Sequence, residues 1–551
     1  MKSTRYFPLL ILAFAIAFCP GVALPAGVAR QEGREAAVDK VFSRWNDKTP
    51  GCAVAVSEHG EVVLEKAYGM ADLEHDAKNL AGTIFEAGSV SKQFTAAAIL
   101  LLARDGKLSI DDPVRNYVPE LPDYGVPLTI RHMLTHTSGL RDWGSVAGLS
   151  GWPRTSRAYT HAHVLDIVSR QRSLNFTPGT SWSYSNTGYN LAAIIIDRVS
   201  GKPFAEFCRE RIFEPLGMKS TSWRDDHTRI VKGRAIAYRE GKDGFHINMP
   251  FENVHGNGGL LTTVGDLLRW NENFFSPRVG DAAFVKQQQQ PGTYSDGTPH
   301  DYAFGLFVRP YKGVPEVGHS GSTAGYQAYL ARYPEQHLSV AVLCNVSSAA
   351  AGRYAHEVSD IYLGEAVRAE PQVKPFDMPP ELLRAKAGVY ALDSTGEPLV
   401  LIFEKEALRA GRADAPPLVP VSPTRFLVPG RGTIDFDDDG RARLTASNGV
   451  VETCTRVVET KPTAEELAEY AGTYFSDEAE TALQVVVQEG ELRVLRRPNT
   501  AFVLRPVYRD GFDAQFGIVR FRRSGGRVTE MSVGLDRVWD MRFRRVGTPS
   551  S

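Results

Sequence analysis

The first part of the chain mixes two hydrophobic periods. Residues 52–69 predict two β-strands on either side of a His59-Gly60 turn, the first of them a continuous apolar run. Residues 326–346 alternate at first and then become wholly apolar, as paired strands of a central sheet do. A further strand-like run lies around residues 302–308. These segments predict a sheet that draws strands from both ends of this part of the chain.

Two nearly uniformly apolar segments of helical length lie between these strands. They are Lys92–Arg104, which Gly106 follows, and Asn190–Val199, which Gly201 follows. Glycine is a common residue just beyond a helix end. Strands at both ends with helices between them predict an α/β (α+β) domain whose central antiparallel sheet is flanked by helices, placed at residues 35–365.

The composition changes after this domain. Residues 366–380 are rich in proline, which predicts a linker. Beyond it, strand-like segments alternate with turn signals at short spacing, as in small barrels or sandwiches. The segment Leu383–Tyr390 is echoed by Leu467–Tyr474, 84 residues later. We therefore predict two small antiparallel β-barrel (lipocalin-like) domains, at residues 381–460 and 463–547.

The internal repeat extends beyond these opening segments. Phe436 follows Tyr390 by 46 residues, and Phe521 follows Tyr474 by 47 residues. Each copy begins with a short helical lead-in and continues through β-hairpins. The matched spacing supports two copies of one β-fold.

The N-terminus has the pattern of a targeting signal. Lys2 and Arg5 precede the apolar run Tyr6–Cys19, which is shorter than the about 20 residues that span a bilayer. Small residues suited to cleavage follow the run. We predict a signal peptide over residues 1–26, an exported protein (periplasmic or secreted) and no transmembrane segment in the mature chain. The alternatives are a buried N-terminal helix and a lipid-modified Cys19.

The charge balance excludes one class of partner. The 551 residues carry 63 Lys and Arg against 64 Asp and Glu, so no global positive field attracts nucleic acid. The segment from Glu491 onward departs from this average, with 13 Arg against 6 acidic residues. We interpret these arginines as the polar face of barrel strands; the alternative is a basic surface that faces an acidic partner or the first domain. No nucleic-acid motif accompanies them, so we predict no nucleic-acid partner. The oligomeric state stays open.

The five cysteines are too few for a disulfide-built scaffold. Cys52 and Cys344 lie inside apolar, strand-like runs, so we expect buried free thiols at both positions. A disulfide formed in an oxidising compartment is the alternative, and the sequence alone does not pair it.

The strongest chemical signal is Gly88-Ser89-Val90-Ser91-Lys92, at the start of the predicted 92–104 helix. Residues three apart share a helix face, so the Ser89 and Lys92 side chains point the same way. A serine becomes a nucleophile when a base takes its proton, and a lysine can be that base if burial lowers its pKa. Taken alone, the motif also fits a helix N-cap followed by a surface lysine.

Two further segments supply complementary groups. Trp182-Ser183-Tyr184-Ser185-Asn186 offers a phenol that can relay a proton and an amide that can orient a lysine. Gly318-His319-Ser320-Gly321-Ser322 offers a backbone that a ligand can approach closely. The Ser322 N–H is a candidate partner of the Ser89 N–H in an oxyanion hole. Taken alone, each segment also fits a structural role.

Together, and in this order, the three segments resemble the serine β-lactamase and penicillin-binding protein superfamily, in its class C-like branch. That family carries Ser-x-x-Lys, Tyr-x-Asn and Lys/His-x-Gly in the same order. The stretches 128–140 and 256–263 also resemble family segments, and the likeness covers residues 40–350. The order of three domains resembles D-aminopeptidases of the superfamily, in which a barrel loop reaches the active site.

The resemblance implies a role for each matching residue. Ser89 would be the acylated nucleophile, Lys92 its base, and Tyr184 the proton shuttle that also activates water. Asn186 would support Lys92 and bind the substrate amide. The opposite wall and the oxyanion hole would come from His319, Gly321 and Ser322, and His136 would be structural. This mechanism needs no metal and no organic cofactor.

The third motif departs from the β-lactamase pattern, because His319 stands where those enzymes carry a lysine that helps to hold the drug carboxylate. We therefore expect an exported serine hydrolase that cleaves an amide bond in D-residue-containing or peptidoglycan-derived peptides. A carboxylesterase, a β-lactamase and a weakly catalytic envelope-binding protein are the alternatives. The substrate would be a small molecule or a peptide.

Two other motifs are weak candidates for metal sites. His161-Ala162-His163-Val164-Leu165-Asp166 resembles a zinc motif, but its aspartate is one position too far and the surroundings look helical. Residues 435–440 resemble half of a calcium loop, but Ala446 stands where the bidentate glutamate belongs. We predict no metal site at either place.

Overall fold

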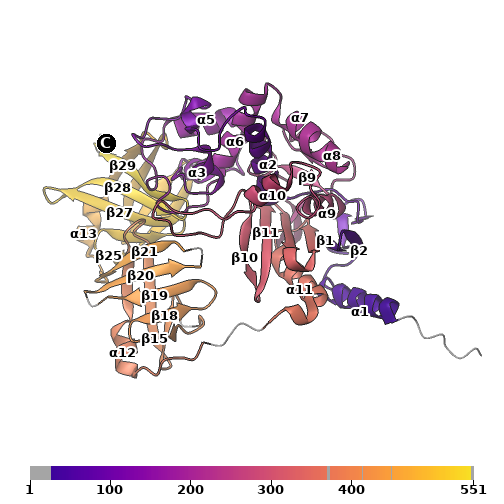
Figure 1. Ribbon diagram of the computed structural model, residues 1–551. Helices are drawn as coiled ribbons and strands as arrows, with labels where there is room; N and C mark the ends of the chain where they lie inside the picture. The colour runs from indigo at the N-terminus through magenta and orange to yellow at the C-terminus, as the bar shows by residue number, and fades with distance from the viewer. Residues whose placement is uncertain (1–25, 369–372, 413, 438, 448, 548–551) are drawn as a thin grey trace, which may run out of the picture.

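The computed structural model describes residues 26–547, apart from 369–372, 413, 438 and 448. The predicted signal peptide therefore lies outside the described residues, except for Ala26. Figure 1 shows a mixed helix-and-sheet domain followed by two β domains packed beside it. Among the helices in the described ranges, none is long and apolar enough to cross a bilayer.

A six-stranded antiparallel sheet forms the middle of the first domain, with strand order β10-β11-β12-β13-β1-β2. The pairing of β1 with β13 joins the beginning of the domain to its end, as the hydrophobic pattern predicts. The strands are β1 (Cys52–Glu58), β2 (Glu61–Tyr68), β10 (Phe307–Tyr311), β11 (Val314–Thr323), β12 (Tyr326–Tyr333) and β13 (Leu338–Cys344). Short strands outside this sheet are β3 (Met70–Asp72), β4 (Ala77–Lys78), β5 (Phe85–Glu86), β6 (Ser222–Trp223), β7 (Tyr238–Gly241), β8 (Gly244–Ile247) and β9 (Leu260–Thr262).

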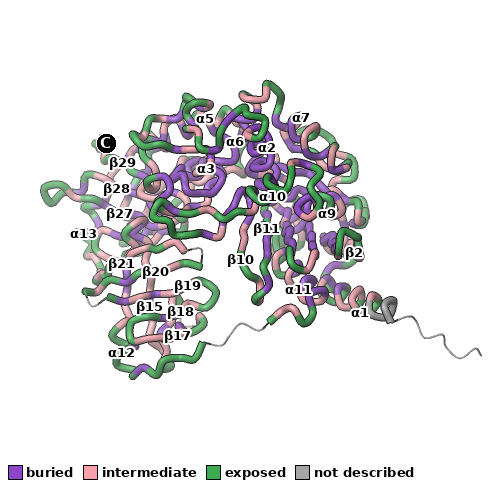
Figure 2. Tube along the Cα trace, in the orientation of Figure 1, coloured by how far each residue is buried: buried purple, intermediate pink, exposed green. Residues whose placement is uncertain are grey.

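Helices cover both faces of the sheet, and the alternation along β1 shows why. Ala53 and Ala55 face a core shared with α2 and α6, whereas Val54 and Val56 face a second core shared with α1 and α11. Figure 2 shows buried residues in the middle of the domain and exposed residues toward its outside. The helices are α1 (Ala26–Val41), α2 (Lys92–Arg104), α3 (Ile130–Leu134), α4 (Trp143–Leu149), α5 (His161–Ser169), α6 (Asn186–Ser200), α7 (Phe204–Cys208), α8 (Glu214–Leu216), α9 (Val264–Glu272), α10 (Ala282–Gln288) and α11 (Ala351–Leu363).

The central helices match the predictions unequally. α2 has the predicted bounds, because every residue from Lys92 to Leu102 is buried and the apolar run therefore coincides with the helix. α6 begins at Asn186 rather than Asn190. Its first turns are polar yet buried, because their amides and hydroxyls bond to neighbouring segments, and hydropathy does not register such burial.

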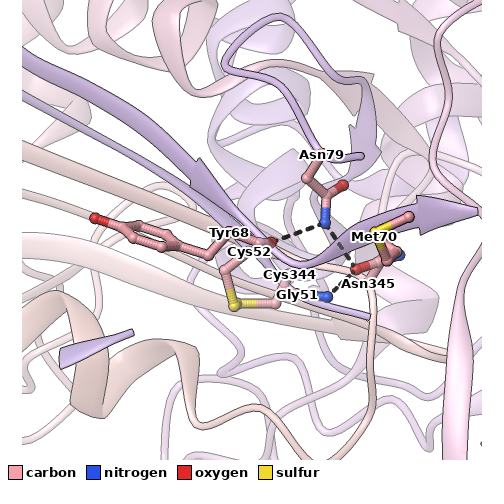
Figure 3. Close-up of a disulfide and its surroundings, with 7 residues drawn as sticks. All are labelled: Gly51, Cys52, Tyr68, Met70, Asn79, Cys344 and Asn345. Atoms are coloured by element: carbon pink, nitrogen blue, oxygen red, sulfur yellow. Dashed lines mark hydrogen bonds between the residues drawn. A yellow bond between two sulfur atoms is a disulfide. The ribbon is translucent and has the colours of Figure 1, made fainter. Parts of the chain in front are cut away.

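Our expectation of free thiols at Cys52 and Cys344 is wrong, since a disulfide of 2.09 Å joins them (Figure 3). The antiparallel register of β1 and β13 places the two residues directly opposite each other. Asn345 follows the bridge, and its Oδ1 accepts a 2.8 Å bond from Gly51 N. Strand register depends on contacts between distant segments, so neither apolar run by itself could predict that Cys52 pairs with Cys344. Cys208 and Cys454 are buried free thiols.

The two C-terminal domains are copies of one β-fold, which confirms the predicted fold class. The second is a closed eight-stranded barrel, β22 to β29. The first is an eight-stranded sheet, β16-β15-β14-β21-β20-β19-β18-β17, whose ends approach through a single Arg409–Pro417 bridge. The first comprises α12 (Pro380–Ala385), β14 (Gly388–Leu392), β15 (Pro398–Glu404), β16 (Ala407–Ala410), β17 (Val419–Pro420), β18 (Arg425–Val428), β19 (Gly432–Phe436), β20 (Arg441–Ala446) and β21 (Val451–Val457). The second comprises α13 (Ala464–Tyr470), β22 (Gly472–Ser476), β23 (Thr481–Gln488), β24 (Glu491–Arg496), β25 (Thr500–Tyr508), β26 (Gly511–Ala514), β27 (Gly517–Ser524), β28 (Arg527–Leu535) and β29 (Val538–Val546).

The sequence repeat corresponds to repeated contacts. Tyr390 packs on Phe436 with ring centroids 5.8 Å apart, and Tyr474 packs on Phe521 at 5.6 Å. In each copy an arginine of the last strand bonds to the end of the lead-in helix. Arg456 donates to the carbonyls of Ala385 and Ala387, and Arg545 donates to those of Glu469 and Ala471. The aromatic pair therefore anchors the same part of the core in both domains.

Candidate active site

Ser89 lies in a tight turn between the sheet and α2. The turn is the 3-10 helix Gly88–Ser91, and it packs against β11. Gly88 has φ +51°, and a Cβ there would lie 2.5 Å from Ser322 N. A Cβ on Gly321 would lie 2.0 Å from Ala87 O. Only glycine permits this approach, which brings the Ser322 amide beside the turn that carries Ser89.

The Lys92 amine is fully buried and faces three acceptors. It lies 3.0 Å from Ser89 Oγ, 2.9 Å from Asn186 Oδ1 and 2.7 Å from the carbonyl of Asn257. Burial holds the pKa of Lys92 well below its usual range, and the charge of Arg537 lowers it further. A neutral amine has two N–H groups and one lone pair. The Asn186 amide oxygen and the Asn257 carbonyl can only accept hydrogen bonds. If they take the two N–H groups, the lone pair faces Ser89, as a general base requires.

Tyr184 completes the polar centre. Its hydroxyl is buried and makes no hydrogen bond to any other residue that the structure describes. Burial raises the pKa of Tyr184, while the nearby Ser89 hydroxyl and Arg537 charge oppose that rise. The group is therefore a phenol rather than a phenolate near neutral pH, which suits a proton relay.

The opposite wall of the cleft carries a neutral histidine. Burial lowers the pKa of His319 to about 3, and the nearby Lys92 adds to the shift. His319 Nδ1 lies 2.5 Å from the Ser320 carbonyl, which can only accept, so Nδ1 carries the proton. Nε2 then accepts from the Tyr302 hydroxyl at 3.0 Å. His319 thus presents no positive charge where β-lactamases carry a lysine.

His136 holds the Tyr-x-Asn segment, as a structural residue would. Its Nδ1 accepts a 3.2 Å bond from Ser185 N, and its ring packs on Tyr184 with centroids 4.2 Å apart. The segment 256–260 supports the same centre, since Thr95 Oγ1 donates to Gly256 O at 2.8 Å. The structure therefore gathers all seven predicted site residues in one region, around a cleft of about 750 Å³.

The sequence reasoning did not identify four residues of this region. Asn257 and Asp142 bond within the polar centre; Asn257 lies in the family-like stretch 256–263 but was given no role there, and Asp142 lies in no recognised motif. Asp536 and Arg537 form the tip of the β28–β29 hairpin and line the cleft. A turn in the last repeat carries no signal that it reaches a site hundreds of residues away in sequence. The resemblance to D-aminopeptidases indicated that a barrel loop would do so, and the basic C-terminal stretch offered a surface that could face the first domain.

Hydrogen bonds seat this hairpin on the first domain. The carbonyl of Arg537 accepts from Asp142 N at 3.2 Å and from Asn175 Nδ2 at 3.2 Å. Trp539 N donates to Asn175 Oδ1 at 2.9 Å. The Arg537 guanidinium then lies 4.8 Å above the Tyr184 ring. Barrel 2, residues 464–546, therefore contributes a cation to the polar centre around Lys92 and Tyr184.

A second cavity of about 180 Å³ adjoins the cleft, and Asp536 lines both. Two further carboxylates, Glu397 and Glu452, come from the first barrel. Trp182 and Trp539 supply aromatic rings. Burial raises the pKa of Glu397 and of Glu452, and the charge of Asp536 adds to the rise. The cavity is thus acidic and aromatic, a combination that favours a cationic group.

The weak metal motifs have other structural partners. In α5, His161 Nε2 contacts the His255 carbonyl at 3.0 Å, whereas His163 Nδ1 contacts Thr160 Oγ1 at 2.9 Å at the start of the helix. In the β19–β20 region, Asp435 pairs with Arg425, and Asp437 pairs with Arg443. These side chains are engaged separately. Across the described ranges, no group of three or more His, Cys, Asp or Glu side chains is arranged to hold a metal ion.

The arginines near the C-terminus divide between two roles. Arg496 donates to Gly148 O at 2.7 Å, and Arg497 donates to Ser150 O at 2.7 Å, so both face the first domain. Arg522 and Arg542 instead pair with Asp540 on the barrel surface. Part of the basic stretch therefore faces the first domain, and part forms the polar face of barrel strands.

Comparison with known proteins places this geometry in a family. The family model described as Beta-lactamase matches residues 36–361. A D-aminopeptidase of Gluconobacter oxydans is 28% identical over 544 residues, which cover 93% of this chain and 98% of the relative. Penicillin-binding protein 4* of Bacillus subtilis is 30% identical over 307 residues, covering 53% of this chain and 67% of the relative.

Solved structures agree on the fold. The octameric penicillin-binding protein homologue from Pyrococcus abyssi is 26% identical with a TM-score of 0.54, covering 78% of this chain and 100% of that one. A structure of SurE covers 95% of this chain and 100% of its own with a TM-score of 0.52, at 18% identity, and so bears on the fold alone. The match to the family model extends over more than half of the chain. The chain therefore belongs to the β-lactamase family and is a serine hydrolase of the superfamily that includes penicillin-binding proteins and D-aminopeptidases.

Proposed function

We propose that this serine hydrolase is an exported D-aminopeptidase, which releases N-terminal residues from D-residue-containing or peptidoglycan-derived peptides. The observation that carries the proposal is the Asp536–Arg537 hairpin, which lines the catalytic cleft. A wall supplied by another domain favours substrates that end there over substrates that pass through. The similarity to a D-aminopeptidase over both barrels supports the same conclusion.

The acidic, aromatic cavity supports an amino terminus as the recognised end. A free α-ammonium is a compact cation that carboxylates and aromatic faces attract. Asp536, Glu397 and Glu452 supply the carboxylates beside the cleft. The disulfide between Cys52 and Cys344 supports export, because such bridges persist in oxidising compartments.

The proposed acylation uses the polar centre in one sequence. Lys92 Nζ accepts the proton of Ser89 as Oγ attacks the scissile carbonyl carbon. The N–H groups of Ser89 and Ser322 stabilise the oxyanion that forms. The proton passes from Lys92 through the Tyr184 hydroxyl to the leaving amine, the C–N bond breaks, and the acyl group remains on Ser89.

Deacylation reverses these roles with water as the nucleophile. The Tyr184 hydroxyl passes its own proton to Lys92 as it accepts one from the attacking water, and the ester bond to Ser89 breaks. The proton returns to Ser89 Oγ, so the centre is restored without a net change of charge. Arg537 favours this cycle because its charge helps to keep Lys92 neutral between turnovers.

A matched pair of substrates tests the proposed specificity. D-Alanine p-nitroanilide has the free ammonium, and its N-acetyl derivative lacks it. Replacing Glu397 and Glu452 by Gln should lower kcat/KM for the free amine by about 10- to 100-fold, the range expected for lost charge-assisted hydrogen bonds, and spare the acetylated substrate. Turnover of short acyl esters alone would indicate an esterase, and preferential hydrolysis of nitrocefin would indicate a β-lactamase.

Two controls test the chemistry and the export. Ser89→Ala should abolish labelling by an active-site serine phosphonate, and persistent labelling would remove Ser89 from the mechanism. Mass spectrometry of the protein from an extracytoplasmic fraction should find its N-terminus near residue 26. An intact N-terminus on cytoplasmic protein would contradict export.

A further inference from the structure

Asp142 lies in a buried hydrogen-bond network and is connected to Lys92 through one residue, Asn186. It is the N-cap of α4, where its Oδ1 accepts from Ser145 N at 3.0 Å. Its other oxygen, Oδ2, accepts from Asn186 N at 2.9 Å and from Asn186 Nδ2 at 2.8 Å. The residue is 3% exposed, so water does not compete for these bonds.

This contact determines which end of the Asn186 amide faces Lys92. An ionised carboxylate can only accept hydrogen bonds, so Asp142 requires the NH₂ group of Asn186 to point toward it. The amide oxygen is then left to face Lys92, at 2.9 Å. The reverse orientation would set the Asn186 oxygen against the Asp142 carboxylate, and two buried acceptors without a proton between them repel each other.

The orientation of Asn186 controls in turn the lone pair of Lys92. With the amide oxygen toward Lys92, Asn186 and the Asn257 carbonyl accept its two N–H groups. The lone pair then faces Ser89 Oγ, 3.0 Å away. With the NH₂ group toward Lys92, the amide would donate to that lone pair and compete with the Ser89 proton.

We propose that Asp142 is a positioning residue for acylation, which acts through Asn186 to direct the lone pair of Lys92 at the nucleophile. The proposal rests on the proposed role of Lys92 as the base. Asp142 touches neither Ser89 nor the reacting carbonyl in this chain of contacts. Nothing in the Ser-x-x-Lys or Tyr-x-Asn motifs specifies it.

Asp142 also acts on Lys92 through its charge, and other groups oppose it. Its carboxylate raises the pKa of Lys92, whereas burial and the charges of Arg537 and Arg154 lower it. Glu252 pairs with Arg154, and the other titratable groups around the centre include Tyr184, Tyr189, His136 and His319. Burial keeps both tyrosines protonated and both histidines neutral, so they add no charge near neutral pH. Removing the Asp142 charge therefore lowers the pKa of Lys92 further.

The test is a double-mutant cycle in the full chain, read out by the rate of Ser89 labelling with a phosphonate. Asp142→Asn keeps the size and the helix cap, because Asn caps helices as well as Asp does. It should slow labelling about 100-fold and shift the acid limb of the pH–rate profile to lower pH. In an Asn186→Ala background, the same substitution should change the plateau labelling rate less than twofold, because the residue through which Asp142 orients Lys92 is gone and Lys92 is already neutral above the acid limb.

Asp281→Asn is the matched control, since Asp281 caps α10 in the same manner and lies outside the polar centre. It should leave the rate and the profile unchanged. Equal slowing by Asp142→Asn in both backgrounds would overturn the proposal, as would an unmoved acid limb. Active-site titration restricts the comparison to folded protein, and Asp142→Ser, which also caps, replaces Asp142→Asn if that variant does not fold.

A separate variant distinguishes this proposal from the function on which it rests. If Lys92→Gln labels at the rate of the unaltered chain, Lys92 is not the base and the proposed mechanism fails. If Lys92→Gln is inactive and Asp142→Asn is not impaired, only the role of Asp142 fails.

Discussion

The two barrels share one fold and differ in what they do for the active site. Barrel 2 is closed, and its β28–β29 hairpin is hydrogen-bonded into the first domain. Its core even includes Val146 and Leu149 from α4. Barrel 1, residues 380–457, closes through a single bridge and contributes carboxylates to the side cavity. The docked copy of the fold thus brings groups into the cleft itself, whereas the other copy reaches only the adjoining cavity.

The ion pair that docks barrel 2 should matter most to stability. Arg141 is 2% exposed at its side chain and pairs with Glu478 of barrel 2, so Arg141→Ala leaves a largely buried carboxylate without this ion-pair partner. We expect the free energy of unfolding to fall by about 3–5 kcal/mol. Arg425→Ala removes an exposed ion pair of barrel 1 and should cost at most about 1 kcal/mol. Denaturant unfolding measures both, and equal losses would mean that the docking contact is not special.

The hairpin tip should matter most to catalysis. Replacing Asp536 and Arg537 by glycines removes both charges from the cleft, and we expect kcat/KM on D-alanine p-nitroanilide to fall about 100-fold, equivalent to about 2.7 kcal/mol. The matched replacement in barrel 1 is Lys405 and Glu406, the exposed turn between β15 and β16. Steady-state kinetics should show no change there. A comparable loss from the barrel 1 turn would remove the distinction between the barrels.

The charge on the tip should also set the pH dependence. Arg537 lowers the pKa of Lys92, so Arg537→Gln lets that pKa rise toward its ordinary value. Because the neutral amine is the active form, the acid limb of kcat/KM moves to higher pH, and activity at a pH on that limb falls by about tenfold for each unit moved. Arg412→Gln, on an exposed site of barrel 1, should leave the profile in place. A shift toward lower pH would contradict this electrostatic role.

The smallest effect compares equivalent tyrosines of the repeat. The Tyr474 hydroxyl donates to Tyr470 O at 2.7 Å, and the Tyr390 hydroxyl donates to Lys386 O at 3.1 Å. Tyr474→Phe should lower the free energy of unfolding by about 1 kcal/mol, and Tyr390→Phe by less, because the longer bond is weaker. Thermal unfolding of the two variants would show whether the closed barrel holds its core more tightly; the reverse order would contradict that.

The hydrophobic pattern was most informative where burial and apolarity coincide. It predicted α2 with the observed bounds and the pairing of early and late strands, because those side chains are buried and apolar. It missed the start of α6, because Asn186 and Thr187 are buried through hydrogen bonds. It also favoured free thiols at Cys52 and Cys344, because the pattern of a strand predicts that its residues are buried but not which strand pairs with it.

The candidate site divides in the same way. Ser89, Lys92, Tyr184 and Asn186 were predictable because their spacing within short motifs reflects local backbone geometry and a family resemblance. Asp142 and Arg537 were not, because they reach the centre through contacts between distant segments. His319 was predicted, but its neutrality follows from its burial beside Tyr302 and Lys92.

By itself, the sequence determined the class of the protein: an α/β domain with a serine–lysine centre, followed by two copies of a small β-fold. These features depend on local periodicity and motif spacing, which a chain carries wherever it folds. Tertiary structure alone decided the disulfide partner, the orientation of Asn186 by Asp142 and the entry of the barrel 2 hairpin into the cleft. Each of these joins residues far apart in the chain, and their contact depends on strand register and domain docking, which no single segment encodes.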